Sequence, residues 1–472
     1  MEDVNMRNAQ TEKVVPLNRL TVVEASRQMR NAQVSARQLT QACLDQIDSR
    51  EHEIRAWVHI DREGALAAAD RCDAMASAGQ WLGPLHGIAV GIKDIFDVAG
   101  MPTAFGSNAW PVSHPTDDSA AVSRLRRAGA VILGKTVTTA FAMGDAGPTR
   151  NPWNTDHTPG GSSSGSAAAV ADAMCFAAVG TQTVGSVIRP CSFNGLAGFK
   201  PSHGAIDIAG VQPLSWRLDH VGGLTRTVSD ARLIWQVLRR KSRTGERTDD
   251  WLSTDADDVS GTGKTGRRPT RVWRCRQMFE SLASDEMRLT LEQHCRALAD
   301  AGVEIVDRPL PEDGEHILAM HQVILAAEAA AVHADAFQRY GKDYPPNISA
   351  LIVAGQSISA TDYLVARQFR RQAIASFTRS LRDVDAAIMP AATGAAPAGL
   401  SFTGDRQMSA PTSFLGLPVV CFPAAIGAGG LPLGLQLMGP AGSEDQLLDF
   451  GQFCESVVGF TGTTDSAGQC GG

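Results

Sequence analysis

The sequence predicts an α/β protein with a mixed, largely parallel central sheet and helices on both faces. Short apolar runs bounded by glycine alternate with amphipathic segments through the first half of the chain. The 472 residues are enough for one large core, and contents of 43% hydrophobic and 20% charged residues are ordinary for a globular protein. At this length the chain can form one large α/β domain or two or three smaller ones.

Helices are predicted at the start of the chain. Thr21 and Glu24 have the spacing of a capping box, in which the Thr21 hydroxyl accepts from the Glu24 amide and the carboxylate returns the bond. Ser35 precedes a long amphipathic segment, and residues 62–78 are expected to form another helix. We expect a strand at residues 54–60, between these two helices.

A buried strand is predicted at residues 88–92, a short apolar run flanked by glycine. This strand would place Lys93 at its end. The alternation then continues with a helix, a strand, a second helix and a second strand at residues 120–128, 130–133, 166–173 and 175–179. Strands separated by helices favour parallel pairing.

The second half begins with a polar stretch at residues 241–270, rich in Thr, Gly, Asp and Arg, which we interpret as a surface loop or a boundary. Beyond it the apolar spacing predicts three long helices, at residues 284–301, 317–340 and 361–381. Later strands are expected at residues 384–390, 419–423 and 431–437. No internal repeat is apparent.

Charge and hydropathy exclude several classes of partner. The net charge is −7, and no acidic or basic block is long enough to form a polyanion-binding face, so no nucleic-acid partner is expected. The N-terminal residues lack the apolar core of a signal peptide, and no apolar run is long enough to span a membrane. We therefore expect a cytoplasmic protein that does not bind membranes.

Cysteine and histidine usage gives no sign of a metal or cofactor. The nine cysteines are scattered without a CxxC pair, so free thiols in the core are expected. Cys191 lies near the second serine motif described below, but packing remains the simpler role. The eleven histidines form neither HExxH nor a cluster, so neither a metal site nor another cofactor is predicted.

The most informative stretch is the Gly/Ser run at residues 159–166, which is followed by a second glycine-flanked serine, Ser186. A Gly/Ser run in polar sequence is usually a flexible linker, but this one is embedded in apolar sequence. Upstream, Lys93 ends the predicted buried strand. One lysine with Ser162 and Ser186, each held by glycine turns, can form a proton relay that ends in a nucleophile.

A serine nucleophile needs a base, and none of these motifs contains the usual histidine. Lysine can act as the base when it is neutral, and burial favours the neutral form. Lys93 follows an apolar strand and should be buried. Asp94 would hold Lys93 protonated if it lay on the same side, but neighbouring residues of a strand point to opposite faces.

Each of these residues also has a simpler interpretation. Lys93 can be a lysine at a strand end that reaches water, Ser162 a helix cap, and Ser186 part of an ordinary tight turn. Their occurrence together in one chain favours the relay. Residues 161–165 also match G-x-S-x-G, the nucleophile elbow of α/β-hydrolases, but that elbow needs a preceding strand, which residues 155–159 do not predict.

Four groups of residues resemble the motifs of the amidase signature family. They are 84–94 with 97–103, 151–154 with 158–169, 180–186 with 189–190 and 198–202, and 416–418 with 430–439. The resemblance covers roughly residues 20–237 and 383–455. It implies a single amidase domain over residues 1–472, with a catalytic core at about 20–240 and 383–455, a polar loop at 241–270, and a variable, helical substrate-side region at about 271–382.

The resemblance also implies roles for the site residues. Lys93 would be the neutral base, Ser186 the acylated nucleophile, and Ser162 the bridging serine, which follows a cis peptide bond. The oxyanion hole, which also contacts substrate, would be formed by backbone N–H groups from Thr183, Val184 and Gly185 to Ser186. Because backbone groups do this, Val184 in place of the more usual glycine is not expected to impair it.

Three positions depart from the family pattern. Gln182 stands where many members have aspartate, Ser164 replaces a glycine, and Arg189 lies three residues after the nucleophile rather than two. The first and third argue against closest similarity to the amidotransferase branch that acts on glutaminyl-tRNA. The proposed lysine and serines are unchanged.

The implied function is hydrolysis of C–N bonds in amides, extending to carbamates (urethanes) and some esters, by a stand-alone amidase that acts on small molecules. The alternative is an amidotransferase A-type subunit that releases ammonia from glutamine within a complex. A non-catalytic relative would normally have lost Lys93, Ser162 or Ser186, and none is lost. A homodimer is compatible with the sequence. The pocket is expected to involve the helix at 317–340, with Met320, or the segment 402–414, although core packing is the simpler role of both.

Overall fold

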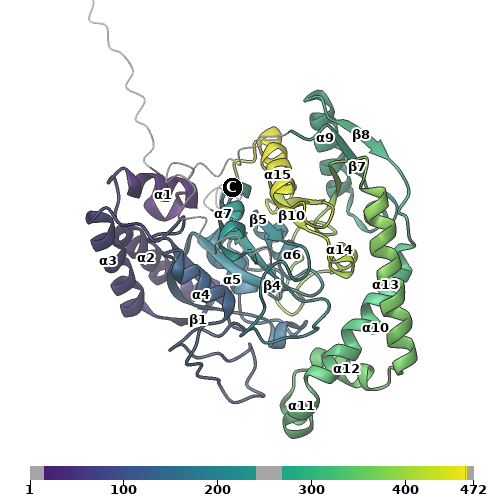
Figure 1. The fold of residues 1–472 in the computed structure, drawn as a ribbon, viewed down its shortest axis with the longest axis horizontal. Coiled ribbons are helices and arrows are strands. Elements are labelled where there is room, and N and C mark those ends of the chain that lie inside the picture. The colour runs from purple at the N-terminus through teal and green to yellow at the C-terminus, as the bar shows by residue number, and fades with distance from the viewer. Residues whose placement is uncertain (1–14, 241–267, 463, 465–472) are drawn as a thin grey trace, which may run out of the picture.

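The computed structural model describes residues 15–240, 268–462 and 464 (Figure 1). Most of the polar stretch at 241–270 therefore lies outside the described residues. One sheet contains the strands β1 (Trp57–Ile60), β2 (Ala89–Lys93), β3 (Val131–Thr136), β4 (Ala177–Gln182), β5 (Ala197–Lys200), β6 (His220–Thr225), β7 (Arg271–Arg274), β8 (Glu304–Asp307), β9 (Ala386–Pro390), β10 (Val419–Ile426) and β11 (Pro432–Met438).

The helices surround this sheet (Figure 1). Those of the first half are α1 (Val22–Arg30), α2 (Ala36–Ile54), α3 (Arg62–Ser77), α4 (Ala120–Arg127), α5 (Ser164–Ala171), α6 (Ile188–Asn194) and α7 (Val228–Leu238). Those of the second half are α8 (Gln277–Leu282), α9 (Asp285–Asp300), α10 (Gly314–Val332), α11 (Ala334–Tyr340), α12 (Pro346–Gln356), α13 (Ala360–Ser380), α14 (Ala410–Leu415) and α15 (Glu444–Val458).

The sheet is mixed, as expected, but its parallel share is smaller than expected. The strand order is β1-β3-β2-β4-β6-β5-β10-β11-β9-β7-β8. Strand β2 pairs in parallel with β3 and β4, and β7 pairs in parallel with β8 and β9, whereas the other pairs are antiparallel. Strands β10 and β11 illustrate why more pairs are antiparallel: they are joined by a short connection, and such a connection between neighbouring strands permits only antiparallel pairing.

Helices cover both faces of the sheet, as predicted. Gly222 and Gly223 are neighbours in β6 and face opposite sides. A Cβ on Gly222 would meet Val187, directly before α6, whereas one on Gly223 would meet Ile234 of α7. Helices α5 and α6 pack together on the first face, and α7 packs with α15 on the second. The two serine motifs thus lie on the α5 and α6 side.

Most predicted elements are present with small shifts at their ends. The capping box at the start of α1 is formed, with Thr21 Oγ1 accepting from the Glu24 amide at 3.1 Å. The predicted strand at 54–60 is shorter, because α2 continues through Ile54 and β1 begins at Trp57. Strand β3 runs through Gly134 and Lys135 rather than ending before them.

Two predictions for the second half are wrong. The single helix expected at 317–340 is two helices, α10 and α11, which meet at His333 with a bend of 65°. At this break the buried His333 ring contacts the Tyr344 hydroxyl at 3.1 Å, so the bend accompanies packing against the following segment. No strand was expected within the helical region 271–382, whereas β7 and β8 lie there and extend the sheet edge. Among the described residues, no single helix is long and apolar enough to cross a membrane.

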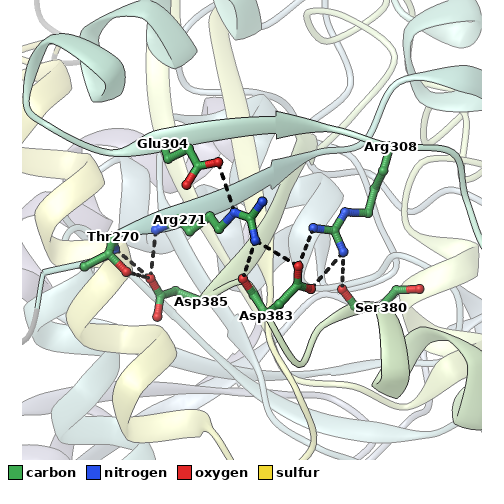
Figure 2. Close-up of polar contacts among 7 residues, drawn as sticks. All are labelled: Thr270, Arg271, Glu304, Arg308, Ser380, Asp383 and Asp385. Carbon is green, nitrogen blue, oxygen red and sulfur yellow. Dashed lines mark hydrogen bonds and ion pairs between the residues drawn. The ribbon is translucent and has the colours of Figure 1, made fainter.

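Ion pairs join this sheet edge to the segment after α13 (Figure 2). Arg308 forms a two-pronged contact with the Asp383 carboxylate, at 2.8 and 2.9 Å, and Arg271 Nη1 lies 2.9 Å from the same group. The Asp385 carboxylate accepts from the backbone amides of Thr270 and Arg271, at 2.6 and 3.0 Å. These two acidic residues therefore fasten the start of β7 to the start of β9.

Asp383→Asn is expected to lower the melting temperature by about 2 °C or less, because exposed ion pairs contribute little. Hydrogen bonds from Arg308 lower the pKa of Asp383 to about 2. The ion pairs are therefore fully present above the unfolded pKa of about 3.9 and are lost as pH falls through about 2. Thermal melts in low salt and in about 1 M NaCl test this, since salt should remove the difference. A large fall that persists in high salt would contradict it.

Candidate active site

Lys93 ends β2, between β3 and β4, and its side chain is fully buried. Its Nζ lies 2.7 Å from Ser162 Oγ and 2.9 Å from Thr181 Oγ1. The alternative of a strand-end lysine reaching water is therefore wrong. Burial lowers the pKa of Lys93 to about 7, with the charge of Asp219 acting in the opposite direction. A substantial fraction of this lysine is thus neutral at neutral pH.

The neighbouring Asp94 points away from Lys93, as strand geometry predicted. Its carboxylate pairs with Lys135 Nζ at 2.9 Å, and both side chains are buried. Lys135 comes from β3, and it also lies 2.6 Å from Thr103 Oγ1. The charge of Asp94 is therefore matched by a different lysine, and among the described residues no carboxylate lies at ion-pair distance from Lys93.

Ser162 follows a cis peptide bond with Gly161, as the family resemblance implied. Arg189, in α6, donates from Nη2 to the Gly161 carbonyl at 2.5 Å, so a side chain of that helix holds the turn in place. Helix α5 begins at Ser164, and its N-cap is Ser163. Ser162 therefore does not cap the helix but contacts Lys93. No strand precedes the turn in the described residues 155–160, so the nucleophile-elbow pattern is not realised.

Ser186 lies in the turn that joins β4 to α6. The side chain of Gln182, at the end of β4, orders this turn. Its Oε1 accepts from the amides of Val187 and Ile188, both at 2.9 Å, and its Nε2 donates to Ser413 Oγ at 3.0 Å. The Ser413 hydroxyl in turn donates to the Val184 carbonyl at 2.7 Å. Position 182 departs from the family pattern, in which many members have aspartate. The Gln182 side-chain amide both accepts and donates hydrogen bonds here, whereas an ionised aspartate can only accept.

The same turn presents backbone donors. Among the described residues, the amides of Val184, Gly185 and Ser186 donate no hydrogen bond to another protein group. Gly185 allows close packing here, because a Cβ at this position would lie 2.9 Å from the Ser409 side chain. Thr183 is fixed on both sides: its hydroxyl donates to Asp219 at 2.6 Å, and its carbonyl lies 3.1 Å from His321 Nε2. The turn is therefore rigid and has free donors.

Ser162 and Ser186 line one cavity of about 660 Å³. Its other walls come from the segment around Thr139 and Met143, from α10 and α12, and from the loop at 401–407. Helix α10 contributes Gln322 rather than Met320, and its apolar residues are part of the core, as the simpler interpretation held. The segment 402–414 does line the cavity, through Phe402 and the residues up to Gln407.

Several contributors were missed in the sequence. Thr181 contacts Lys93, and its signal was available: it is a polar residue within a buried glycine-bounded strand. Asp219 contacts Thr183 in the turn that carries Ser186, but nothing in its local sequence marks it. Asn347 and Leu351 line the cavity from α12, a helix for which no motif was recognised. Only the tertiary structure places that helix over the serines.

The cysteines in the described part are all free and buried. Burial raises the pKa of the Cys191 thiol well above its usual value, so this residue packs beside the site and is a poor nucleophile. Within the described residues, no group of three or more His, Cys, Asp or Glu side chains is arranged to hold a metal ion.

Known proteins match this chain both in sequence and in fold. The amidase family model matches residues 38–448. The chain belongs to the amidase signature family. Its fold matches a solved amidase with a TM-score of 0.83 and 29% identity, covering 93% of this chain and 100% of the other. It also matches the peptide amidase of Stenotrophomonas maltophilia, with a TM-score of 0.82 and 27% identity, over 95% and 99% of the two chains.

Two curated relatives of this chain are named for different functions. One, from Desulforapulum autotrophicum, is the A-type subunit of its glutamyl-tRNA(Gln) amidotransferase and is 32% identical, over 94% of this chain and 99% of its own. The other is an amidase of Pseudomonas putida, which is 37% identical over 377 residues, 79% of each chain. The departures at Gln182 and Arg189 therefore do not separate the chain from the amidotransferase branch in the way that was expected. The family cleaves C–N bonds, and these relatives include both an amidotransferase subunit and an amidase.

Proposed function

We propose that this chain hydrolyses C–N bonds of small-molecule amides through an acyl-enzyme on Ser186, with Ser162 and Lys93 as the proton relay. The observation that carries the proposal is the 2.7 Å contact between Ser162 Oγ and the fully buried Lys93 Nζ, beside a cavity that Ser162 shares with Ser186. A buried amine with a pKa of about 7 is suited to accept a proton at neutral pH.

In the first half-reaction, Ser186 Oγ attacks the carbonyl carbon of the substrate. The Ser186 proton passes to Ser162 as the Ser162 proton passes to Lys93, which becomes an ammonium ion. The carbonyl oxygen takes the negative charge, so the positive and negative charges formed are equal. The amides of Val184, Gly185 and Ser186, which have no protein acceptor in the described residues, are suited to stabilise that oxyanion.

The tetrahedral intermediate then collapses. The C–N bond breaks, the leaving nitrogen takes a proton from Ser162, and Ser162 recovers one from Lys93. Water attacks the resulting ester by the same route and releases the acid with Ser186 restored. Carbamates and some esters fit the same scheme, because each presents a carbonyl and a leaving group that Ser162 can protonate.

A second function is favoured by a specific observation, namely that curated relatives over most of the chain are A-type subunits of amidotransferases. In that case the chain would release ammonia from glutamine and act within a complex. The chemistry at Ser186 would be the same, and the difference would lie in the substrate and in the partner. A cytoplasmic location and a homodimer of the stand-alone enzyme remain predictions.

Hydrolysis of added amides by the purified single chain tests the two functions. We expect turnover of aryl amides, aliphatic amides or carbamates without any partner, with loss of that turnover in a matched Ser186→Ala preparation. Ammonia release from glutamine should be weak by comparison. Activity on glutamine alone, and only after an amidotransferase partner is added, would contradict the first proposal and support the second. No turnover in any arm would contradict both.

A further inference from the structure

Asp219 is a buried carboxylate without a cationic partner at ion-pair distance in the described part of the chain. It accepts three hydrogen bonds: its Oδ2 from the amides of Leu214 and Ser215, at 2.8 and 3.0 Å, and its Oδ1 from Thr183 Oγ1, at 2.6 Å. Donors arranged in this way stabilise the ionised form. The fold therefore maintains a negative charge beside the nucleophile turn.

Two threonines connect this carboxylate to the buried lysine. Thr181 and Thr183 are two residues apart along β4 and its continuation, so their side chains lie on the same side. The Thr181 hydroxyl lies 2.9 Å from Lys93 Nζ, and the Thr183 hydroxyl donates to Asp219. Thr181, Thr183, Asp219 and His220 also line one cavity of about 10 Å³, which has the size of about one water molecule.

We propose that Asp219 is a positioning residue that supplies the counter-charge for the Lys93 ammonium formed each time Lys93 takes the proton from Ser162. The carboxylate acts over a distance on Lys93, from the side of Thr181 and Thr183. It does not accept the proton, and the charge balance of each step is unchanged. This inference rests on the proposed function, because it assigns a role only if Lys93 is the base.

The other groups around Lys93 cannot supply this counter-charge, because they are neutral or already paired. Ser162 and Thr181 contact the amine as neutral hydroxyls, and Asp94 on the same strand is paired with Lys135. The nearby His220 and His321 are neutral at pH 7, because burial lowers the pKa of both imidazoles.

Asp219 is thus the charge that acts on Lys93 in the described part of the chain. Burial raises the pKa of Asp219 to about 6, so the group is largely ionised at pH 7 and above, where Lys93 must act as a base.

Asp219→Asn tests the proposal, because the amide keeps a hydrogen-bonding side chain of the same shape but removes the charge. The readout is the rate at which a fluorophosphonate labels Ser186 as a function of pH, together with kcat/KM for an amide that the wild type hydrolyses. Wild type should show a rise with a midpoint near the Lys93 pKa of about 7. Without the carboxylate, the ammonium form of Lys93 is less stable, so the midpoint should shift to lower pH.

We expect a shift of about one pH unit, and a fall in plateau kcat/KM of roughly tenfold or more, since one pKa unit corresponds to a tenfold change. Asp219→Glu, which retains the charge, should return the midpoint toward that of wild type. The matched control is Asp230→Asn, which changes another fully buried carboxylate with a pKa of about 6, on α7. It should leave the midpoint unchanged even if it lowers the melting temperature.

The outcomes distinguish a failure of the proposed function from a failure of the role proposed for Asp219. If wild-type Ser186 is not labelled and no amide is hydrolysed, the proposed function fails. If wild type is labelled with a midpoint near 7 and Asp219→Asn leaves that midpoint unchanged or raises it, the role of Asp219 is overturned while the function stands. Should Asp219→Asn not fold, Asp219→Ser, which is smaller and still forms hydrogen bonds, replaces it with the same expected shift and the same contradicting result.

Discussion

Ser186→Ala is expected to abolish turnover and to leave the fold intact. The change removes the Oγ atom that is proposed to form the acyl-enzyme. The turn keeps the hydrogen bonds that the Gln182 side chain accepts from the backbone amides of Val187 and Ile188. Removal of a serine nucleophile commonly lowers kcat by about 10⁴-fold to 10⁶-fold. We expect a loss of at least about 10⁴-fold here, because Ser162 is held against Lys93 and cannot replace the nucleophile without moving.

Labelling by a fluorophosphonate, followed by peptide mapping, checks this result independently of the substrate. Wild type should carry the label on Ser186, and Ser186→Ala should carry none. Ser192→Ala is the matched control, because it removes a buried hydroxyl from α6, the helix that follows Ser186, where Ser192 accepts from the Gly434 amide. That variant should be labelled and active. A label found on another residue, or turnover that persists in Ser186→Ala, would contradict the assignment of the nucleophile.

Much of this site could be predicted because its signals are local. The Gly/Ser run, the second glycine-flanked serine and the lysine after an apolar strand are all short-range patterns, and the structure brings Lys93 and Ser162 into contact. The alternation of residues along a strand correctly separated Lys93 from Asp94. Each of these inferences depends on a few neighbouring residues, for which steric rules are strong.

The rest could not be predicted because it depends on contacts between distant segments. Asp219 meets Thr183 only because β6 pairs with β4 in antiparallel register. At the bend, His333 contacts Tyr344, a residue eleven positions further along the chain, while the apolar periodicity of the sequence continues through the bend. The antiparallel share of the sheet likewise follows from which strands become neighbours. Local patterns predict elements, whereas these features are decided by packing.

Lys93→Met should remove nearly all activity, because methionine occupies a similar volume but cannot accept a proton. We expect kcat/KM to fall by about 10³-fold to 10⁴-fold, near the upper end of what a general base contributes. Lys200→Met is the matched control: Lys200 is also a fully buried lysine whose pKa burial lowers to about 7, but it ends β5 and contacts the Leu417 carbonyl instead of a serine. Lys200→Met should retain activity. Equal losses in both variants would indicate a structural role for Lys93.

The pH dependence gives a second test of the same residue. Neutral Lys93 is the active form, so wild-type kcat/KM should be low below pH 6 and should rise through about pH 7 to a plateau. A residual rate in Lys93→Met should lack this rise. A wild-type profile that is flat from pH 5 to 9, or that falls as pH rises through 7, would contradict the neutral-lysine mechanism.

Lys93→Met should lower activity but raise the stability of the fold at pH 7. Lys93 has a pKa of about 7 in the folded protein and about 10.4 in the unfolded chain, so between these values the unfolded chain binds more protons. Wild-type stability should therefore gain a contribution from Lys93 as pH rises from 7 toward 10, whereas Lys93→Met has no such contribution. The variant should melt at a higher temperature than wild type at pH 7, and its advantage should shrink at pH 9. Thermal melts at the two pH values measure this, and a variant that is less stable at pH 7 would show that burial of this lysine does not oppose folding.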